Sequence, residues 1–310
     1  MKLVGIHHIT AITGDAPANV DFYTRVLGLR LVKKSVNQDD PTVYHLFYAD
    51  EKGSAGSDLT FFEYPGAARG RPGRGMVHRI AWRVASEDAL SFWAERLADE
   101  GVQVGRPGPG ALRFQDPEGL EQDLVVDESG DDPLIADHPQ VPAEHALRGF
   151  DGVRAYTQDA ELSRPLLEQA LAFEPNGDGW EIRGAARGST YAYDPPPAAS
   201  GIQGAGTIHH VAWASPMDDH EAWRDAVLRA GGRPTPVIDR FYFRSVYFRE
   251  PSGVLFEIAS DGPGFTVDGY TVEQLGSTII LPPALEPRRE RIEAILTPLP
   301  DPRAQRSPAR

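Results

Sequence analysis

Two stretches that each contain a His-His pair decide the fold: Gly5-Ile6-His7-His8-Ile9-Thr10 and Gly206-Thr207-Ile208-His209-His210-Val211. A third stretch, Gly75-Met76-Val77-His78-Arg79-Ile80, is similar, and a weaker copy begins near Gly149. Each is a short β-like run that leads into a helix pattern and then into further strand-like runs with turn signals. The sequence therefore predicts four βαβββ units, which begin near residues 5, 75, 149 and 206.

Start and stop signals support a helix after the first strand of each unit. A polar cap or proline favours a helix start, and glycine favours its end. These signals are Asp15 and Gly28 in unit one, Ser86 and Gly101 in unit two, and Ser215-Pro216 and Gly231-Gly232 in unit four. The pattern in unit three covers about residues 159–172 and is interrupted by Pro165.

The chain of 310 residues is long enough for roughly two domains. We expect an N-terminal half at residues 1–135 and a C-terminal half at 147–262, each with two units. The Pro-rich and acidic stretch 127–146 reads as the linker between them. Residues 263–310 form a C-terminal arm, with a strand or turn at 272–281, a short helix at 286–296 and a disordered tail at 301–310.

Composition excludes several classes of function. The net charge of −14 argues against nucleic-acid and membrane-surface partners, because such a field repels phosphate. The chain has no cysteine, which excludes disulfides, thiolate zinc sites, iron–sulfur clusters and cysteine nucleophiles. It has neither a signal-like N-terminus nor a long apolar run, so we expect a cytoplasmic protein. A homo-oligomer is compatible with the sequence.

The repeat register selects three candidate metal ligands. At the second position of the paired motif, units one and four carry His8 and His210, whereas units two and three carry Arg79 and Gly152. Unit four adds Glu257, four residues after the glycine of a tight turn. If units one and four face each other, two imidazoles and one carboxylate converge, as in non-haem Fe(II) sites that use O₂. Mn(II), Co(II) and Zn(II) suit this set less selectively.

Residues beside these ligands are candidates for proton transfer and substrate binding. Neighbouring side chains of a strand point to opposite faces, so His7 and His209 are expected to act as acid/base or supporting residues rather than ligands. Tyr247 is expected opposite Glu257, within reach of substrate, and Arg240 is placed to stabilise an anion. Arg244 is more simply a rim residue.

A purely structural role, without metal binding or catalysis, remains open for the same residues. The four histidines of the two pairs could merely satisfy hydrogen bonds at strand ends. Glu257 could point to solvent between Phe256 and Ile258, and its counterpart Asp123 has no neighbouring ligands. Convergence of the three candidate side chains in space is what separates the two interpretations.

These residues resemble the vicinal oxygen chelate superfamily, whose members pair βαβββ modules around a metal. More closely, the chain is similar to the four-module ring-cleaving dioxygenases of the hydroquinone type. The similarity runs nearly from end to end and includes residues 39–48, 59–62, 141–150 and 239–259. It implies an α+β fold in which four βαβββ modules form paired mixed sheets around a metal cavity.

The resemblance also implies a ligand set and a reaction. Fe(II), with Mn(II) as the alternative metal, would be held by His8, His210 and Glu257. The surrounding functional residues would be His7, Thr10, His209, Arg240 and Tyr247. The partners would be a small 1,4-dihydroxy aromatic substrate and O₂, and both oxygen atoms would be inserted as the ring opens.

Two other functions stay open at this point. A glyoxalase-like isomerase or thiol transferase would use the same scaffold with Ni, Zn or Mn, and Glu63 at the end of its strand would then be a fourth ligand of low rank. A non-catalytic small-molecule binding protein would lack the converged ligands, so the presence of all three argues against it.

Overall fold

The computed structural model describes residues 1–303, and its elements follow the predicted order of units. Unit one contains β1 (Ile6–Thr13), α1 (Ala16–Asp21), the π-helical turn η1 (Phe22–Val26), β2 (Arg30–Val36), β3 (Tyr44–Ala49) and β4 (Asp58–Glu63). Unit two contains β5 (Val77–Val84), α2 (Glu87–Asp99), β6 (Ala111–Gln115) and β7 (Glu121–Val126).

The C-terminal units continue this order. Unit three contains β8 (Phe150–Tyr156), η2 (Ala160–Leu162), η3 (Pro165–Ala170), β9 (Glu174–Asn176), β10 (Gly179–Arg183) and β11 (Gly188–Asp194). Unit four contains β12 (Ile208–Ser215), η4 (Met217–Asp219), α3 (His220–Arg229), β13 (Ile238–Asp239), β14 (Phe243–Arg249) and β15 (Leu255–Pro263). The arm contains η5 (Val272–Gln274), η6 (Glu286–Arg288) and α4 (Arg289–Glu293). Of the tail predicted to be disordered, residues 304–310 lie outside the described residues.

The predicted helix starts of units one and two are confirmed. Asp15 Oδ1 accepts a hydrogen bond from the Ala18 amide at 3.0 Å, and Ser86 Oγ accepts one from the Ala89 amide at 3.3 Å. Both side chains thereby satisfy backbone donors that a first helical turn leaves unpaired. Gly101 follows the second helix at φ +74°, in the left-handed region that favours glycine.

The structure corrects two details of the predicted units. In unit three, the expected helix over 159–172 is a 3₁₀ turn, η2, and a short π-helical segment, η3. Pro165 explains the break, because proline has no amide hydrogen and cannot continue a helix that began before it. In unit two, an isolated bridge between Gly105 and Arg113 stands where the first of three strands was expected after α2.

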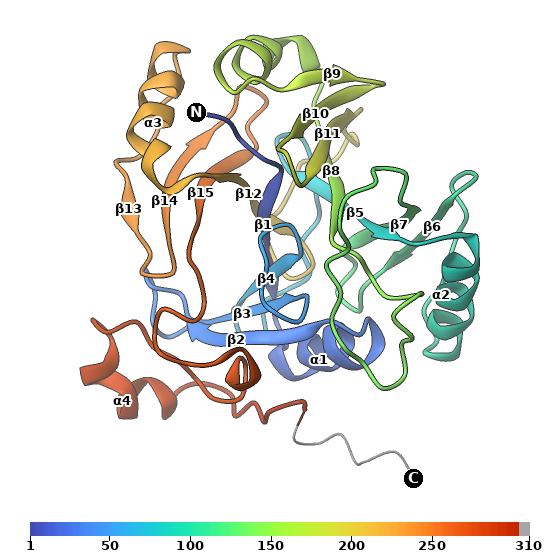
Figure 1. The fold of residues 1–310 in the computed structure, drawn as a ribbon, viewed down its shortest axis with the longest axis vertical. Helices are drawn as coiled ribbons and strands as arrows, with labels where there is room; N and C mark the ends of the chain where they lie inside the picture. The colour runs from blue at the N-terminus through green and yellow to red at the C-terminus, as the bar shows by residue number, and fades with distance from the viewer. Residues whose placement is uncertain (304–310) are drawn as a thin grey trace.

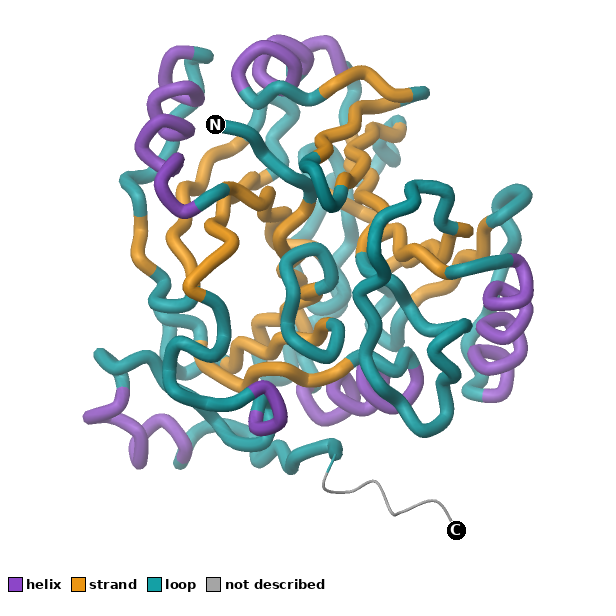
Figure 2. Tube along the Cα trace, viewed as in Figure 1, coloured by secondary structure: helices purple, strands orange, loops and turns teal. Residues whose placement is uncertain are grey.

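The units combine into two mixed sheets, which confirms the α+β class. One sheet joins units one and four in the order β13-β14-β15-β12-β1-β4-β3-β2 and curls into an open half-barrel (Figure 1). The other joins units two and three in the order β6-β7-β5-β8-β11-β10-β9. Helices lie on the periphery of both sheets (Figure 2). The boundary between an N-terminal and a C-terminal half stays a prediction.

The seam between the first and last units is the centre of the larger sheet. Strand β1 pairs antiparallel with β12 on one side and parallel with β4 on the other, and β12 pairs parallel with β15. Large side chains such as Trp82, Trp213 and Phe256 are fully buried around the two sheets. Rigid, hydrogen-bonded strands therefore carry the side chains that project from this seam.

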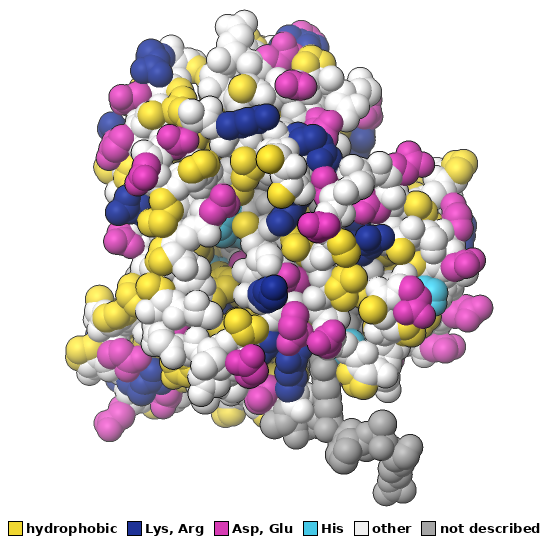
Figure 3. Space-filling view, viewed as in Figure 1, with side chains coloured by type: hydrophobic (Ala, Val, Ile, Leu, Met, Phe, Trp, Pro, Cys, Tyr) yellow, Lys and Arg dark blue, Asp and Glu magenta, His cyan; other side chains and the backbone are white. Residues whose placement is uncertain are grey.

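The surface shows mixed charge. On the face drawn in Figure 3, acidic and basic side chains are interspersed, with scattered apolar side chains between them. Within residues 1–303, no helix combines the length and the apolar character that a bilayer span needs.

Candidate metal centre

Strand register brings the three predicted ligands to one face of the larger sheet. His8 of β1 lies opposite Ala212 of β12, and Ala212 lies beside Glu257 of β15. His210 precedes Ala212 by two positions, so its side chain projects from the same face. Because the side chain of Ala212 is only a methyl group, there is room on this face of the sheet for the side chains of the three candidate ligands.

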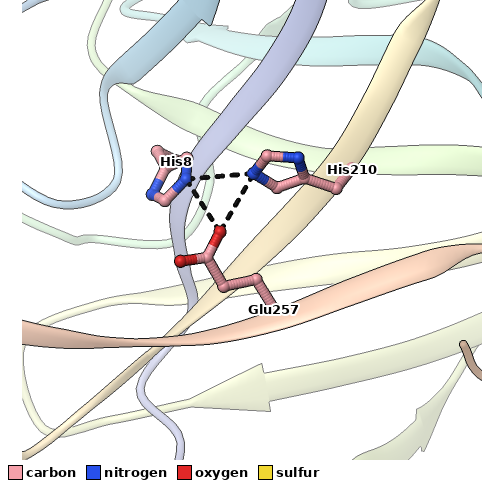
Figure 4. A group of neighbouring side chains, drawn as sticks. All are labelled: His8, His210 and Glu257. Atoms are coloured by element: carbon pink, nitrogen blue, oxygen red, sulfur yellow. Dashed lines mark hydrogen bonds and ion pairs between the residues drawn. The ribbon is translucent and has the colours of Figure 1, made fainter. Parts of the chain in front are cut away.

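The ligand atoms of these residues face one another (Figure 4). The Nε2 atoms of His8 and His210 are 3.3 Å apart. Oε2 of Glu257 is 3.2 Å from Nε2 of His8 and 2.9 Å from Nε2 of His210. All three residues are buried, and their candidate ligand atoms lie within 4.8 Å of one another. The alternative that Glu257 points to solvent is wrong, since its side chain is 0% exposed.

The electrostatics of this group fit a divalent cation. Burial alone would raise the pKa of Glu257, but the neighbouring His8 and His210 hold its pKa well below the usual range. Within residues 1–303, Oε2 of Glu257 faces the two ligand imidazoles but accepts no hydrogen bond of good geometry. A buried carboxylate oxygen that lacks a donor is costly unless a cation compensates it. A metal held by two imidazoles and this oxygen would supply that compensation.

The first histidine of each pair supports the second. Nδ1 of His7 lies 2.9 Å from Nδ1 of His8, and Nε2 of His7 lies 3.1 Å from the Ser260 carbonyl oxygen. Nδ1 of His209 lies 2.8 Å from Nδ1 of His210. Burial, together with the adjacent histidine, lowers the pKa of His7 and of His209 to about 3. Both are therefore neutral near pH 7, and each orients its neighbour so that Nε2 faces the centre.

Two threonines border the ligand group on the β4 side. Thr10 Oγ1 is 3.0 Å from Nε2 of His210 and 2.8 Å from Oγ1 of Thr60. Thr60 Oγ1 is in turn 2.9 Å from Nε2 of His45. Sequence reasoning proposed Thr10 only through the family resemblance, and it missed Thr60 and His45. Thr60 could have been found once the pairing of β1 with β4 was known, because their parallel register places Thr60 beside Thr10.

Strand β14 contributes two further polar side chains. Tyr247 lies opposite Glu257 in the β14–β15 register, as predicted. Ser245, two positions earlier and on the same face, donates a hydrogen bond from Oγ to Oε1 of Glu257 at 2.5 Å. The prediction missed Ser245, although the two-residue period of a strand starting from Tyr247 would have found it.

Arg240 closes one side of the site. Its guanidinium makes two hydrogen bonds to the Asp39 carboxylate, at 3.0 and 2.9 Å, and lies 5.5 Å from the Tyr247 ring centroid. Gln38 Nε2 donates to the Arg240 carbonyl oxygen at 2.7 Å. The loop that carries Gln38 and Asp39 is thereby tied to unit four across the mouth of the site.

A small cavity joins these residues to the ligand group. It measures about 50 Å³ and is lined by both ligand histidines, by His45, Phe47 and Phe62, and by Arg240 and Tyr247. The Gln38–Asp39 loop lines the same cavity.

The remaining candidates lie outside this group. Glu63, the low-ranked fourth ligand, accepts a hydrogen bond from the Ala16 amide at the start of α1 at 3.1 Å. Arg244 is exposed, in line with its interpretation as a rim residue. Asp123, the counterpart of Glu257 in unit two, is held by two hydrogen bonds from Arg113 at 2.7 and 2.8 Å.

Comparison with known proteins gives this arrangement a family context. A family model described as the Glyoxalase/Bleomycin resistance protein/Dioxygenase superfamily matches residues 5–123 and 158–258. MhqA of Bacillus subtilis (strain 168), named as a ring-cleaving dioxygenase, is 41% identical over 96% of this chain and all of its own length. A chlorohydroquinone/hydroquinone 1,2-dioxygenase of Sphingobium indicum is 33% identical over 92% of this chain and 93% of its own.

Solved structures agree with this placement. A crystal structure described as that of a dioxygenase from Bacillus subtilis is 39% identical and has a TM-score of 0.89, covering 96% of this chain and 98% of its own. Glyoxalase I from Zea mays has a TM-score of 0.59 at 18% identity, covering 83% of this chain and 92% of its own. The second similarity concerns the fold alone.

Proposed function

Because the chain belongs to the glyoxalase/bleomycin resistance protein/dioxygenase superfamily, we propose that it is an Fe(II)-dependent dioxygenase that cleaves the ring of a hydroquinone-type 1,4-dihydroxy aromatic and inserts both atoms of O₂. The observation that carries this proposal is the buried group of His8, His210 and Glu257. Two imidazoles and one carboxylate leave coordination positions open for both substrate and O₂.

In this proposal, His8, His210 and Glu257 hold the iron. Bound Fe(II) would lower the pKa of a coordinated phenol and supply electrons to O₂. His7 and His209 fix the orientation of the ligand imidazoles through their Nδ1 contacts. A role for His209 in accepting or returning a substrate proton stays a prediction, because its Nδ1 faces His210 and its ring is not among those that line the cavity.

The other proposed functional residues act on the substrate. Phe47 and Phe62 give the cavity apolar walls for an aromatic ring, and Tyr247 offers a hydroxyl near the ligand group. Burial raises the pKa of Tyr247, so this hydroxyl remains a donor. Arg240 brings a positive charge to the mouth, where it stabilises an anionic substrate or product. Thr10 borders the position where a bound hydroxyl would lie.

The proposal is tested by metal loading followed by oxygen uptake. Protein purified without oxygen and loaded with Fe(II) is expected to retain about one iron per chain and to consume O₂ with substituted hydroquinones. His210→Ala should abolish both iron retention and uptake, because it removes one of three protein ligands. Glu63→Gln is the matched control, since this carboxylate caps α1 and lies outside the ligand group.

Two results would contradict the proposal. Retention of iron and uptake by His210→Ala would remove the ligand assignment. Zinc or nickel in the purified protein, with glutathione-dependent turnover and no oxygen uptake, would favour an isomerase instead. Assays with catechols beside hydroquinones then define which arrangement of the two hydroxyls the site accepts.

A further inference from the structure

His45 of β3 shares the cavity with the ligand histidines, although it belongs to neither His-His pair. Its ring centroid lies 4.0 Å from that of Phe47 and 4.5 Å from that of Phe62. Phe62 is its register partner on β4. Two aromatic side chains on rigid strands therefore hold the imidazole in one orientation.

A continuous line of hydrogen bonds runs from this imidazole to the ligand group. Nε2 of His45 lies 2.9 Å from Thr60 Oγ1, which lies 2.8 Å from Thr10 Oγ1. Thr10 Oγ1 lies 3.0 Å from Nε2 of His210. A bound metal would take the lone pair of this nitrogen, so the hydroxyl of Thr10 would end the line beside the metal position, where it can accept a proton from a bound substrate hydroxyl. The line crosses neighbouring strands of the larger sheet, from β3 over β4 and β1 to β12.

The chemistry of the three groups suits proton transfer. A hydroxyl both donates and accepts, so two hydroxyls in series can pass a proton in either direction. Nδ1 of His45 has no hydrogen-bond partner among residues 1–303, whereas Nε2 faces Thr60. With the proton on Nδ1, the Nε2 lone pair faces the line.

We propose that His45 is the acceptor for the proton that a substrate hydroxyl releases on binding at the metal centre, with Thr10 and Thr60 as the relay. This inference rests on the proposed function. The substrate O–H bond breaks and its electron pair stays on the substrate oxygen. Thr10 takes this proton and passes its own to Thr60, which passes its own to Nε2 of His45. The proton returns by the same line when product leaves.

Single substitutions at Thr60 and His45 test the relay. Thr60→Val removes the hydroxyl with little change of shape, and we expect kcat to fall by roughly 10²-fold, the scale of general-base catalysis. Thr60→Ser restores the hydroxyl and should stay within about threefold of the parent protein, a difference below about 0.7 kcal/mol in activation free energy. His45→Ala should match Thr60→Val in kcat, with unchanged iron content, and added imidazole should restore part of the lost rate.

Two measurements separate a relay from a packing role. The double variant of His45→Ala and Thr60→Val should be no slower than either single variant, because both remove the same path. In metal-free protein, ¹⁵N NMR should show His45 protonated on Nδ1, and Thr60→Val but not Thr60→Ser should shift its Nε2 resonance. The NMR readout does not depend on turnover.

Three results would overturn the relay. The first is a kcat for His45→Ala within threefold of that of the parent protein. The second is a fold decrease in kcat of the double variant that equals the product of the decreases in the two single variants. The third is a His45 Nε2 resonance that Thr60→Val does not shift. Failure of the proposed function is distinguishable from these results. In that case the iron-loaded parent protein itself consumes no O₂ with any diol, whereas the Thr60 effect on the His45 resonance persists.

Discussion

At the scale of single residues, the two sheets show how one position changes the chemistry of a repeated fold. Arg79 of unit two stands where unit one has His8, and its guanidinium lies 3.5 Å from Asp123. Arg113 binds the same carboxylate. The acidic position that serves as a candidate ligand in unit four is thus neutralised by protein cations in unit two.

We predict that Arg79→His does not create a second metal centre. Gly152 occupies the position of the second histidine, and a Cβ atom there would lie 2.0 Å from Thr190 Oγ1 and 2.5 Å from the Thr190 carbonyl oxygen. The second imidazole is therefore sterically excluded as well as absent. Metal analysis of this variant should still give about one iron per chain, and a value near two would contradict the prediction.

His78 provides a pH-dependent contribution to stability. Burial and the adjacent Arg79 lower the pKa of His78 to about 4, against the opposing attraction of Asp194. Below pH 6.5 the unfolded chain takes up a proton that the folded chain resists until about pH 4, so stability is lost as the pH falls through this window. Between pH 7.5 and 5 this loss amounts to roughly 2 kcal/mol.

We expect the His78→Gln variant not to lose this part of its unfolding free energy between pH 7.5 and pH 5. Urea unfolding at pH 7.5 and pH 5 should show the parent protein losing roughly 2 kcal/mol more than the variant, because other groups titrate alike in both. Equal losses in the two proteins would show that His78 does not resist protonation in the fold.

Residues differ in how far the sequence could predict them. His8 and His210 follow from repeat register, because units two and three carry Arg79 and Gly152 at the matched position. Glu257 is selected less sharply, since unit two also carries a carboxylate, Asp123, at its matched position. His45 does not follow from repeat register, since it has no counterpart pair and its place depends on how β3 pairs with β4. Such pairing is a tertiary property, and one strand pattern is compatible with several registers.

At the scale of elements, β2 holds the C-terminal arm through buried cations. Nη2 of Arg30 donates to the carbonyl oxygens of Val272, Glu273 and Leu275, at 2.6 to 3.3 Å. Lys34 Nζ donates to the Ser277 and Leu299 carbonyl oxygens. The arm, predicted only as a strand or turn followed by a short helix, is thus an integral layer over the edge of the larger sheet.

Arg30→Met should strongly destabilise the protein. The substitution leaves buried carbonyl groups of the arm unsatisfied, and such losses cost about 3 kcal/mol in total. Arg25→Met is the matched control, because its ion pairs with Asp21 and Glu100 are exposed and contribute about 1 kcal/mol or less. Urea unfolding checks both, and equal effects of the two substitutions would contradict the role given to Arg30.

At the scale of the whole molecule, each sheet draws strands from both halves of the chain. β1 lies between β12 and β4, and β5 lies between β7 and β8. The sequence predicted that units one and four meet, and the β1–β12 pairing confirms it. The sequence could not predict the curl of the sheet or the position of the Gln38–Asp39 loop beside the cavity, because both depend on contacts between distant segments.

We predict that residues 1–135 and 147–303, produced separately, neither fold nor bind iron, and that mixing them restores both. Each half would expose the apolar seam strands that its partner covers, and His8 is on a different half from His210 and Glu257. Circular dichroism and metal analysis of the separate and mixed halves check this. A folded, iron-free N-terminal half on its own would instead support independent domains.

The position of β1 also determines when, during synthesis of the chain, the complete metal centre can first form. Its histidine is 202 positions from its partner on β12, and the carboxylate on β15 is made later still. Contacts this distant in sequence form slowly, and chain synthesis runs at about 5–20 residues per second. A nascent polypeptide still lacking β15 offers only a partial chelator, so cation capture has to follow release of nearly the entire chain from the ribosome.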